Sequence, residues 1–299
     1  MRIGIDLGGT KIEGILLSSG GHVLRRKRVP TPQGDYTRTI QAICDLVDEL
    51  ETGQSATCTV GIGIPGTIAP DTRLVKNANS TWLIGKPLDR DLMSALQRPV
   101  RLANDADCFA MSEATDGAAA GCQTVFGVIL GTGVGGGIVI SHHLLAGPNA
   151  IAGEWGHNPL PAMSRSEQPG TACYCGRTGC IETFLSGPGL ATRHHQRTGE
   201  ELSAEQIASL ATPTCEASMA AYEDQLARAL GSIINIIDPD AIVLGGGLSK
   251  IERLFRNVPL IWERYVFSPT VVTRLLPPKH GDSSGVRGAA WLWQDERAG

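Results

Sequence analysis

Three cysteines lie close together near the middle of the chain, at Cys173, Cys175 and Cys180. His157 precedes the first of them by sixteen residues. Three thiolates and one imidazole form a set that suits tetrahedral Zn²⁺, and a site with all four positions filled by protein is structural rather than catalytic. Reduced cysteines in a loop, or a redox pair, are the alternatives that the spacing leaves open.

Three glycine-rich segments have the composition of phosphate-binding turns: GIDLGGTK, GTGVGG and LGGGLS. Glycine lets backbone N–H groups approach phosphate oxygens without a Cβ in the way. The first is not a P-loop and the second is not a dinucleotide fingerprint, because each leads into a strand pattern rather than a helix. Any one of them could be a plain β-turn, but three in one chain favour phosphate binding. The predicted nucleotide-binding residues are Asp6, Gly8, Gly9, Thr10, Lys11, Gly131, Thr132, Gly133, Gly245, Gly246 and Gly247.

Side chains around these turns add polar groups to the backbone. Thr10 and Thr132 supply hydroxyl donors, and Lys11 supplies a positive charge. Asp6, on the strand before the first turn, is suited to holding Mg²⁺ through water, since Mg²⁺ usually keeps several of its waters. The third turn lies between a predicted strand and a predicted helix, where the nucleoside end of ATP would fit.

The segment RLANDADCF places Asn104, Asp105 and Asp107 at the end of a predicted strand. Phosphoryl transfer to a hydroxyl needs an acceptor held in line and a base to take its proton. A carboxylate in this position could be that base. An Asn-Asp pair is also a common turn and helix cap, so the residues alone leave both interpretations open.

The elements that must position these groups follow from the apolar periodicity. A strand, a glycine turn and a second strand occur near residue 9 and again near residue 133. Two such hairpins predict two related α/β domains facing each other across a cleft, over residues 1–117 and 118–299. Strands are predicted near 3–7, 12–18, 22–29, 60–64, 100–105, 124–130, 138–141 and 241–244, and helices near 35–50, 106–119, 219–237 and 251–265.

The composition is that of a soluble globular protein of 299 residues, with 42% apolar and 19% charged residues. A net charge of −4 gives no reason to expect nucleic acid or an anionic membrane as a partner. No apolar run approaches the roughly 20 residues that a membrane span needs. The N-terminus lacks the pattern of a signal peptide, so we expect a cytoplasmic protein with reduced cysteines.

Side chains outside these segments have ordinary expectations. Cys44, Cys58, Cys108 and Cys122 are predicted to be buried apolar residues, as free cysteines usually are. His194 and His195 lie in the polar segment ATRHHQRTG and are predicted to be solvated.

Five motifs in this order, DLGGTK, GTGVGGG, GEWGH, CYCGRTGC and LGGGLS, resemble the ROK family of sugar kinases and repressors over essentially the whole chain. The resemblance implies the actin-like ATPase (ribonuclease H-like) fold, with two α/β lobes around a cleft and a last helix that packs back on the first lobe. It also implies ATP, Mg²⁺ and structural Zn²⁺, and a homodimer. Family repressors carry an added N-terminal helix-turn-helix, for which there is no room before Ile3, so the kinase branch is implied.

The resemblance also assigns roles to individual residues. Asp105 is implied as the base, and Asn104 as a hydrogen-bond partner of a sugar hydroxyl. Glu154, His157 and Glu182 are implied to contact sugar hydroxyls, a task that suits carboxylates because their oxygens accept from vicinal hydroxyls. The four zinc ligands implied by the family are the same His157 and three cysteines.

The acceptor sugar is expected from two further segments. Residues 76–88, KNANSTWLIGKPL, form the predicted selectivity loop with Asn79 as a sugar contact. NANSTW and the C-terminal HGDSSGVRGAAWLW are similar to bacterial fructokinases and mannokinases, which implies phosphorylation of fructose at its 6-hydroxyl, with mannose as a second substrate. The alternatives are an N-acetylglucosamine, N-acetylmannosamine or glucose kinase, and a non-catalytic sugar sensor.

Overall fold

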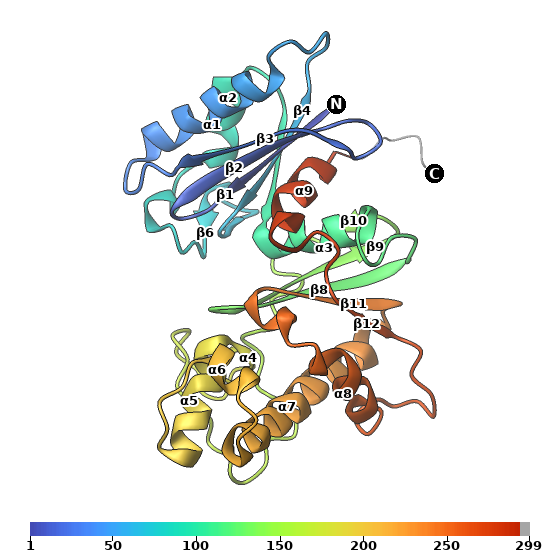
Figure 1. Cartoon of the computed structure of the whole chain (residues 1–299). Helices are drawn as coiled ribbons and strands as arrows, with labels where there is room; N and C mark the ends of the chain where they lie inside the picture. The colour runs from blue at the N-terminus through green and yellow to red at the C-terminus, as the bar shows by residue number, and fades with distance from the viewer. Residues whose placement is uncertain (294–299) are drawn as a thin grey trace.

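Two five-stranded sheets form the centres of two lobes that are stacked one above the other (Figure 1). The computed structural model describes residues 1–293, apart from the side chain of Asp282, so the last residues of the predicted second lobe, 294–299, lie outside the described residues. The strand orders are β3-β2-β1-β4-β7 and β10-β9-β8-β11-β12. The predicted pair of α/β units is therefore present.

The first sheet begins with the hairpin predicted around residue 9. Strand β1 pairs antiparallel with β2 and parallel with β4, and β4 pairs in parallel with β7. Helix α1 begins where predicted, because the Asp35 side chain accepts a hydrogen bond from the Arg38 N–H at 3.0 Å. The elements are β1 (Arg2–Leu7), β2 (Lys11–Leu17), β3 (Val23–Pro30), α1 (Tyr36–Glu51), β4 (Thr59–Ile64), β5 (Thr67–Ile68), β6 (Val75–Lys76), α2 (Leu88–Leu96) and β7 (Val100–Asn104).

The second sheet repeats the strand directions of the first. Strand β8 pairs antiparallel with β9 and parallel with β11, and β11 pairs in parallel with β12. Helix α7 is the longest at 25 residues, and none of the described helices is both long and apolar enough to cross a membrane. The elements are β8 (Thr124–Leu130), β9 (Val134–Ile140), β10 (His143–Leu144), α4 (Glu182–Leu185), α5 (Gly187–Thr198), α6 (Ala204–Ser209), α7 (Pro213–Ile237), β11 (Ala241–Gly245), α8 (Arg253–Trp262) and β12 (Arg274–Leu276).

Two helices connect the lobes. Helix α3 (Asp105–Thr115) follows β7 but packs against β8 and β9, whereas α9 (Ser284–Trp291) follows β12 but packs against β1 and β4. The two helices also pack on each other, at a contact so close that a Cβ on Gly288 would lie 1.6 Å from the Cys108 carbonyl oxygen. Glycine is therefore required where the two backbones meet. We propose the domain boundary near residue 117, just after α3.

Candidate active site

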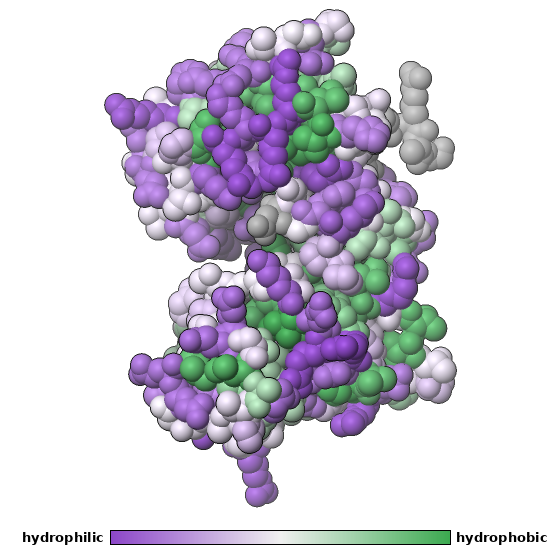
Figure 2. All heavy atoms as spheres, in the orientation of Figure 1, coloured by the Kyte–Doolittle hydropathy of each residue, from purple (hydrophilic) through white to green (hydrophobic). Residues whose placement is uncertain are grey.

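A cavity of about 770 Å³ is lined by residues of both lobes, and Figure 2 shows the hollow that separates the lobes on one side of the molecule. Asp105, the first residue of α3, lines this cavity and is exposed to it. Asn104 caps the helix, because its Oδ1 accepts from the Ala106 N–H at 2.9 Å. Its Nδ2 donates to the Gly66 carbonyl oxygen at 3.2 Å, so the amide orientation is fixed. Both interpretations of the Asn-Asp pair thus hold together: Asn104 is a helix cap, and Asp105 faces a cavity.

The acidic side chains that line this cavity have raised pKa values. The surrounding protein raises the pKa of Asp105, chiefly through desolvation and further through the negative charge of Glu154. Desolvation, with the nearby carboxylates of Asp105 and Glu13, raises the pKa of Asp6 to about 6. Asp6 lines the same cavity as Asp105. A carboxylate whose ionisation is disfavoured by neighbouring carboxylates, as at Asp6, fits a divalent cation, whose charge would relieve the repulsion.

Two of the three glycine turns face Asp105. Gly8, Gly9 and Thr10 line its cavity from the first lobe, and Gly245 and Gly246 line it from the end of β11. The conformation of Gly246 is one that other residues rarely adopt, with φ of +80°, and a Cβ there would lie 2.4 Å from the Leu130 carbonyl oxygen. Lys11 is exposed next to the first turn.

The remaining turn lies at a neighbouring cavity of about 800 Å³, lined by Gly131, Thr132 and Gly247. The N–H of Gly187, at the start of α5, donates to the Gly131 carbonyl oxygen at 2.8 Å, which fixes this turn to a helix. Lys250 lines both cavities and was not predicted. A lysine three residues after a glycine triplet is the sequence signal that could have found it.

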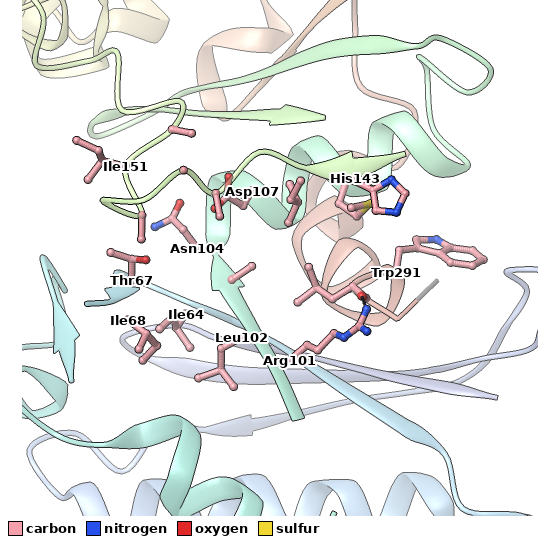
Figure 3. A pocket seen from close by; sticks show the side chains of 18 of the residues that line it. Ile64, Thr67, Ile68, Arg101, Leu102, Asn104, Asp107, His143, Ile151 and Trp291 are labelled. Atoms are coloured by element: carbon pink, nitrogen blue, oxygen red, sulfur yellow. Dashed lines mark hydrogen bonds between the residues drawn. The ribbon is translucent and has the colours of Figure 1, made fainter. Parts of the chain in front are cut away.

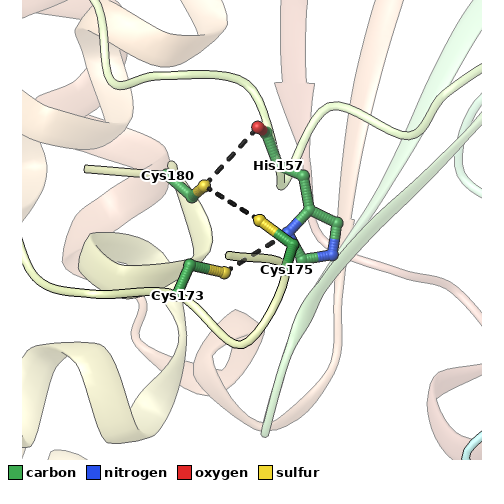
Figure 4. A group of neighbouring side chains, drawn as sticks. All are labelled: His157, Cys173, Cys175 and Cys180. Atoms are coloured by element: carbon green, nitrogen blue, oxygen red, sulfur yellow. Dashed lines mark hydrogen bonds between the residues drawn. The ribbon is translucent and has the colours of Figure 1, made fainter. Parts of the chain in front are cut away.

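The predicted zinc ligands converge (Figure 4). The ligand atoms of His157, Cys173, Cys175 and Cys180 all lie within 4.8 Å of one another. The Sγ atoms of Cys175 and Cys180 are 3.6 Å apart, and Cys173 Sγ is 3.5 Å from His157 Nδ1. Zinc bonds of about 2.3 Å to sulfur and 2.0 Å to nitrogen in a tetrahedron place such pairs about 3.8 and 3.5 Å apart. The four residues therefore fit Zn²⁺.

The loop that carries these ligands also carries the predicted sugar contacts. Glu182 begins α4, and its carboxylate accepts from the Val134 N–H at 2.9 Å, next to the second glycine turn. The second imidazole nitrogen of His157, Nε2, lies within hydrogen-bond distance, 3.0 Å, of the hydroxyl of Tyr174. Tyr174 is 83% exposed and was not predicted, although its position between two ligand cysteines is a usable signal. Glu154 is exposed and close enough to raise the pKa of Asp105.

The other predicted sugar residues lie on two sides of Asp105. Asn79 lines the 770 Å³ cavity together with Asp105. Asn104 and Glu154 line a third cavity of about 1080 Å³, shown in Figure 3. Asp107, for which no binding role was predicted, lines this third cavity as well.

A model of the ROK family matches residues 2–296 of the chain. The chain belongs to the ROK family. An N-acetyl-D-glucosamine kinase from Escherichia coli O6:H1 is 40% identical over 299 residues, which cover 98% of this chain and 99% of that protein. A protein of the same name from Yersinia pseudotuberculosis serotype O:1b is 38% identical over 304 residues, which cover 99% of this chain and 100% of the relative.

Solved structures of ROK proteins are similar along the whole chain. A ROK hexokinase from Thermus thermophilus has a TM-score of 0.86 at 28% identity, and the alignment covers 97% of each chain. A ROK glucokinase from Streptomyces griseus, crystallised with glucose and AMPPNP, has a TM-score of 0.75 at 28% identity and is aligned over 98% of its length and 97% of this chain. The predicted two-lobe, actin-like ATPase fold is confirmed.

Proposed function

We propose that this ROK protein transfers the terminal phosphoryl group of ATP to the 6-hydroxyl of a hexose, and that N-acetyl-D-glucosamine is its main acceptor. This choice of acceptor is supported by relatives that are 38–40% identical over essentially the full length of both chains and are named N-acetyl-D-glucosamine kinases. The prediction of fructose, with mannose second, is not supported by these relatives, and the N-acetylglucosamine alternative is favoured. The prediction rested on short loop segments, whose physical chemistry does not choose among hexoses.

Asp105 is proposed as the base that takes the proton from the acceptor hydroxyl. Its raised pKa makes it a stronger base than an ordinary aspartate, and its exposure to the cavity leaves it accessible to a hydroxyl. Asn104 keeps a second amide N–H and a second lone pair after its two internal hydrogen bonds. These are free to orient the sugar.

The nucleotide is proposed to lie along the three glycine turns. The N–H groups of Gly8 and Gly131 close their own turns, on the carbonyl oxygens of Lys11 and Gly133. The remaining N–H groups of the three turns would bind phosphate oxygens, with positive charge from Lys11 and Lys250. Asp6 would hold Mg²⁺, which, when bound, neutralises charge on the transferred phosphate. The chain's own contribution is positioning, because the turns and Asp105 belong to the same lobes and the same set of adjoining cavities.

His157, Cys173, Cys175 and Cys180 would hold structural Zn²⁺, which, when bound, fixes the loop that carries them. Glu154, His157 and Glu182 are proposed to bind the sugar hydroxyls from this loop. Their positions would then be set before the sugar arrives, which lowers the entropy lost on binding.

An assay of ADP release with N-acetylglucosamine, N-acetylmannosamine, glucose, fructose and mannose tests the proposal. We expect the highest kcat/KM with N-acetylglucosamine. A higher value with fructose would restore the first prediction, and sugar binding with no ADP release would favour the sensor. Light scattering tests the expected homodimer, and fractionation of cells tests the expected cytoplasmic location.

A further inference from the structure

The 1080 Å³ cavity is larger than a monosaccharide needs, since cavities of roughly 300–1,000 Å³ hold drug-sized ligands. Figure 3 shows its walls at one end: Ile64 and Ile68 from the first lobe, Ile151 from the loop after β10, and Asp107 from α3. Asn104 lies among them. The cavity thus begins at a proposed sugar contact and continues away from it.

The orientation of the sugar follows from two adjacent residues. Asp105 lines the cavity of the glycine turns, whereas Asn104 lines the larger cavity. A hexose whose 6-oxygen meets Asp105 and whose ring meets Asn104 lies between the two. In a pyranose, C2 is across the ring from C5, the atom that carries C6. The substituent on C2 therefore points away from Asp105 and toward the larger cavity.

The chemistry of this end of the cavity matches an amide with an apolar tail. Asp107 is partly exposed, but its Oδ1 is buried without a hydrogen-bond partner. Desolvation, with the charges of Glu154 and Asp105, raises its pKa to about 7. A carboxyl group in this state can donate to an amide carbonyl when protonated and accept from an amide N–H when ionised. Ile68 and Ile151, which are at least partly exposed, offer an apolar surface to the methyl end of an acyl group, whereas Ile64 is buried in the core of the first lobe.

We infer that Asp107, Ile68 and Ile151 form the subsite for a 2-acylamino group, and that the cavity beyond them admits acyl chains longer than acetyl. This inference rests on the proposed kinase function. Asp107 is then a specificity-determining residue: it distinguishes a 2-acylamino sugar from glucose, whose 2-hydroxyl does not reach the apolar walls.

The first test compares kcat/KM for N-acetylglucosamine with kcat/KM for glucose. We expect Asp107→Ala to lower this ratio by about tenfold, the scale of one lost hydrogen bond to a buried group. Asp107→Asn should restore part of the ratio, because an amide also donates and accepts. Asp48→Ala, on the exposed face of α1, is the matched control and should leave the ratio unchanged. An unchanged ratio in folded Asp107→Ala would overturn the inference.

The second test uses the unaltered protein with N-acetyl-, N-propanoyl- and N-butanoylglucosamine. We expect kcat/KM not to fall from acetyl to butanoyl, because the cavity beyond the isoleucines has room for the longer chains. In Ile68→Trp the value should fall steeply with chain length, whereas Ile236→Trp, at a position that is 78% exposed on α7, should behave as the unaltered protein. A tenfold loss from acetyl to propanoyl in the unaltered protein would contradict the open cavity.

The two proposals fail separately. A protein that phosphorylates glucose but not N-acetylglucosamine removes the proposed acceptor and the subsite with it. A protein that prefers N-acetylglucosamine but whose preference is insensitive to Asp107→Ala retains the proposed function and loses only the subsite.

Discussion

The two lobes share one sheet topology but differ in what is inserted into it. In the first lobe, β3 and β4 are joined by a short connection that contains α1. In the second lobe, the equivalent connection between β10 and β11 holds the cysteine loop and helices α4 to α7. The elements that the two lobes share, called the frame below, include the proposed base and the first glycine turn. Glu154, His157 and Glu182 lie in the segment between β10 and β11, called the insertion below. With these proposed roles, the base lies in the frame, and three of the proposed sugar contacts lie in the insertion.

The insertion is nevertheless fastened to the frame. Trp155 Nε1 donates to the Gly135 carbonyl oxygen of β9 at 3.0 Å, and its ring packs edge-on against Phe126 of β8 at 5.5 Å between centroids. Glu182 adds the hydrogen bond to the Val134 N–H. Because these contacts lie outside the cysteine cluster, we expect a substitution in the cluster to weaken sugar binding more than it weakens the packing of the insertion on the sheet.

The frame is tested by Asp105→Asn, for which we expect the largest effect. Loss of the base should lower kcat by about 10²–10⁴-fold, the usual contribution of base catalysis, with the KM for the sugar changed by less than about threefold. Steady-state kinetics of the folded variant measure both constants. Asp48→Asn is the control for an acidic residue outside the cavity. Near-normal turnover of Asp105→Asn would place the base elsewhere.

Cys175→Ser tests the insertion. Without a complete ligand set, we expect the KM for the sugar to rise by on the order of tenfold to a hundredfold, while the KM for ATP changes little. Zinc content, measured by elemental analysis, should fall in parallel. Cys44→Ser, in α1 and remote from the ligand cluster in sequence, is the matched control. A zinc-free protein with an unchanged KM for the sugar would contradict a role for the metal in recognition.

Gly246→Ala and Gly247→Ala test two adjacent glycines that look alike in the sequence but have different surroundings in the structure. At Gly246 a methyl group would meet the Leu130 carbonyl oxygen and the backbone has a positive φ, so we expect the free energy of unfolding to fall by about 1–3 kcal/mol. At Gly247 nothing lies within 4 Å of the added atom, so the loss should be much smaller. Denaturant unfolding without nucleotide measures both, and equal losses would argue against a steric cause.

The smallest expected effect is that of Glu154, in the insertion, on the pKa of Asp105, in the frame. Protonated Asp105 cannot accept a proton, so kcat/KM should fall as the pH falls through its raised pKa, at a higher pH than for an ordinary aspartate. Glu154→Gln removes a negative charge that raises this pKa, so the acidic limb should move to lower pH. The pH profile of kcat/KM measures the shift, with exposed Glu201→Gln as the control. An acidic limb that stays in place would mean that Glu154 does not act on Asp105.

Much of the frame could be predicted because it depends on local patterns. Alternating apolar residues predicted β1 and β4, and the Asp35 cap predicted the start of α1. The cysteine spacing predicted four converging ligands, since three of them lie within eight residues and leave little freedom for their arrangement. Cys58, Cys108 and Cys122 are buried as predicted, and Cys44 is half-buried.

The prediction that His194 is solvated was wrong. Its side chain is completely buried, 2.9 Å from Ser218 Oγ of α7 and 3.1 Å from Glu200. The polar neighbours in sequence indicated a solvated segment, but α5 lies against α7 and turns this one histidine inward. Sequence context reports the average exposure of a helix and not which of its faces is covered.

By itself the sequence determined most strands of the two sheets, the glycine turns and the ligand set, because each depends on residues near one another in the chain, and the repeated hairpin indicated the pair of lobes. Only the tertiary structure decided that α3 packs on the sheet of the other lobe, that Lys250 lines two cavities, and that Asp107 lines a cavity with Asn104 and Glu154. These features depend on surfaces that meet only when both lobes have folded, and no local pattern encodes how two distant surfaces fit.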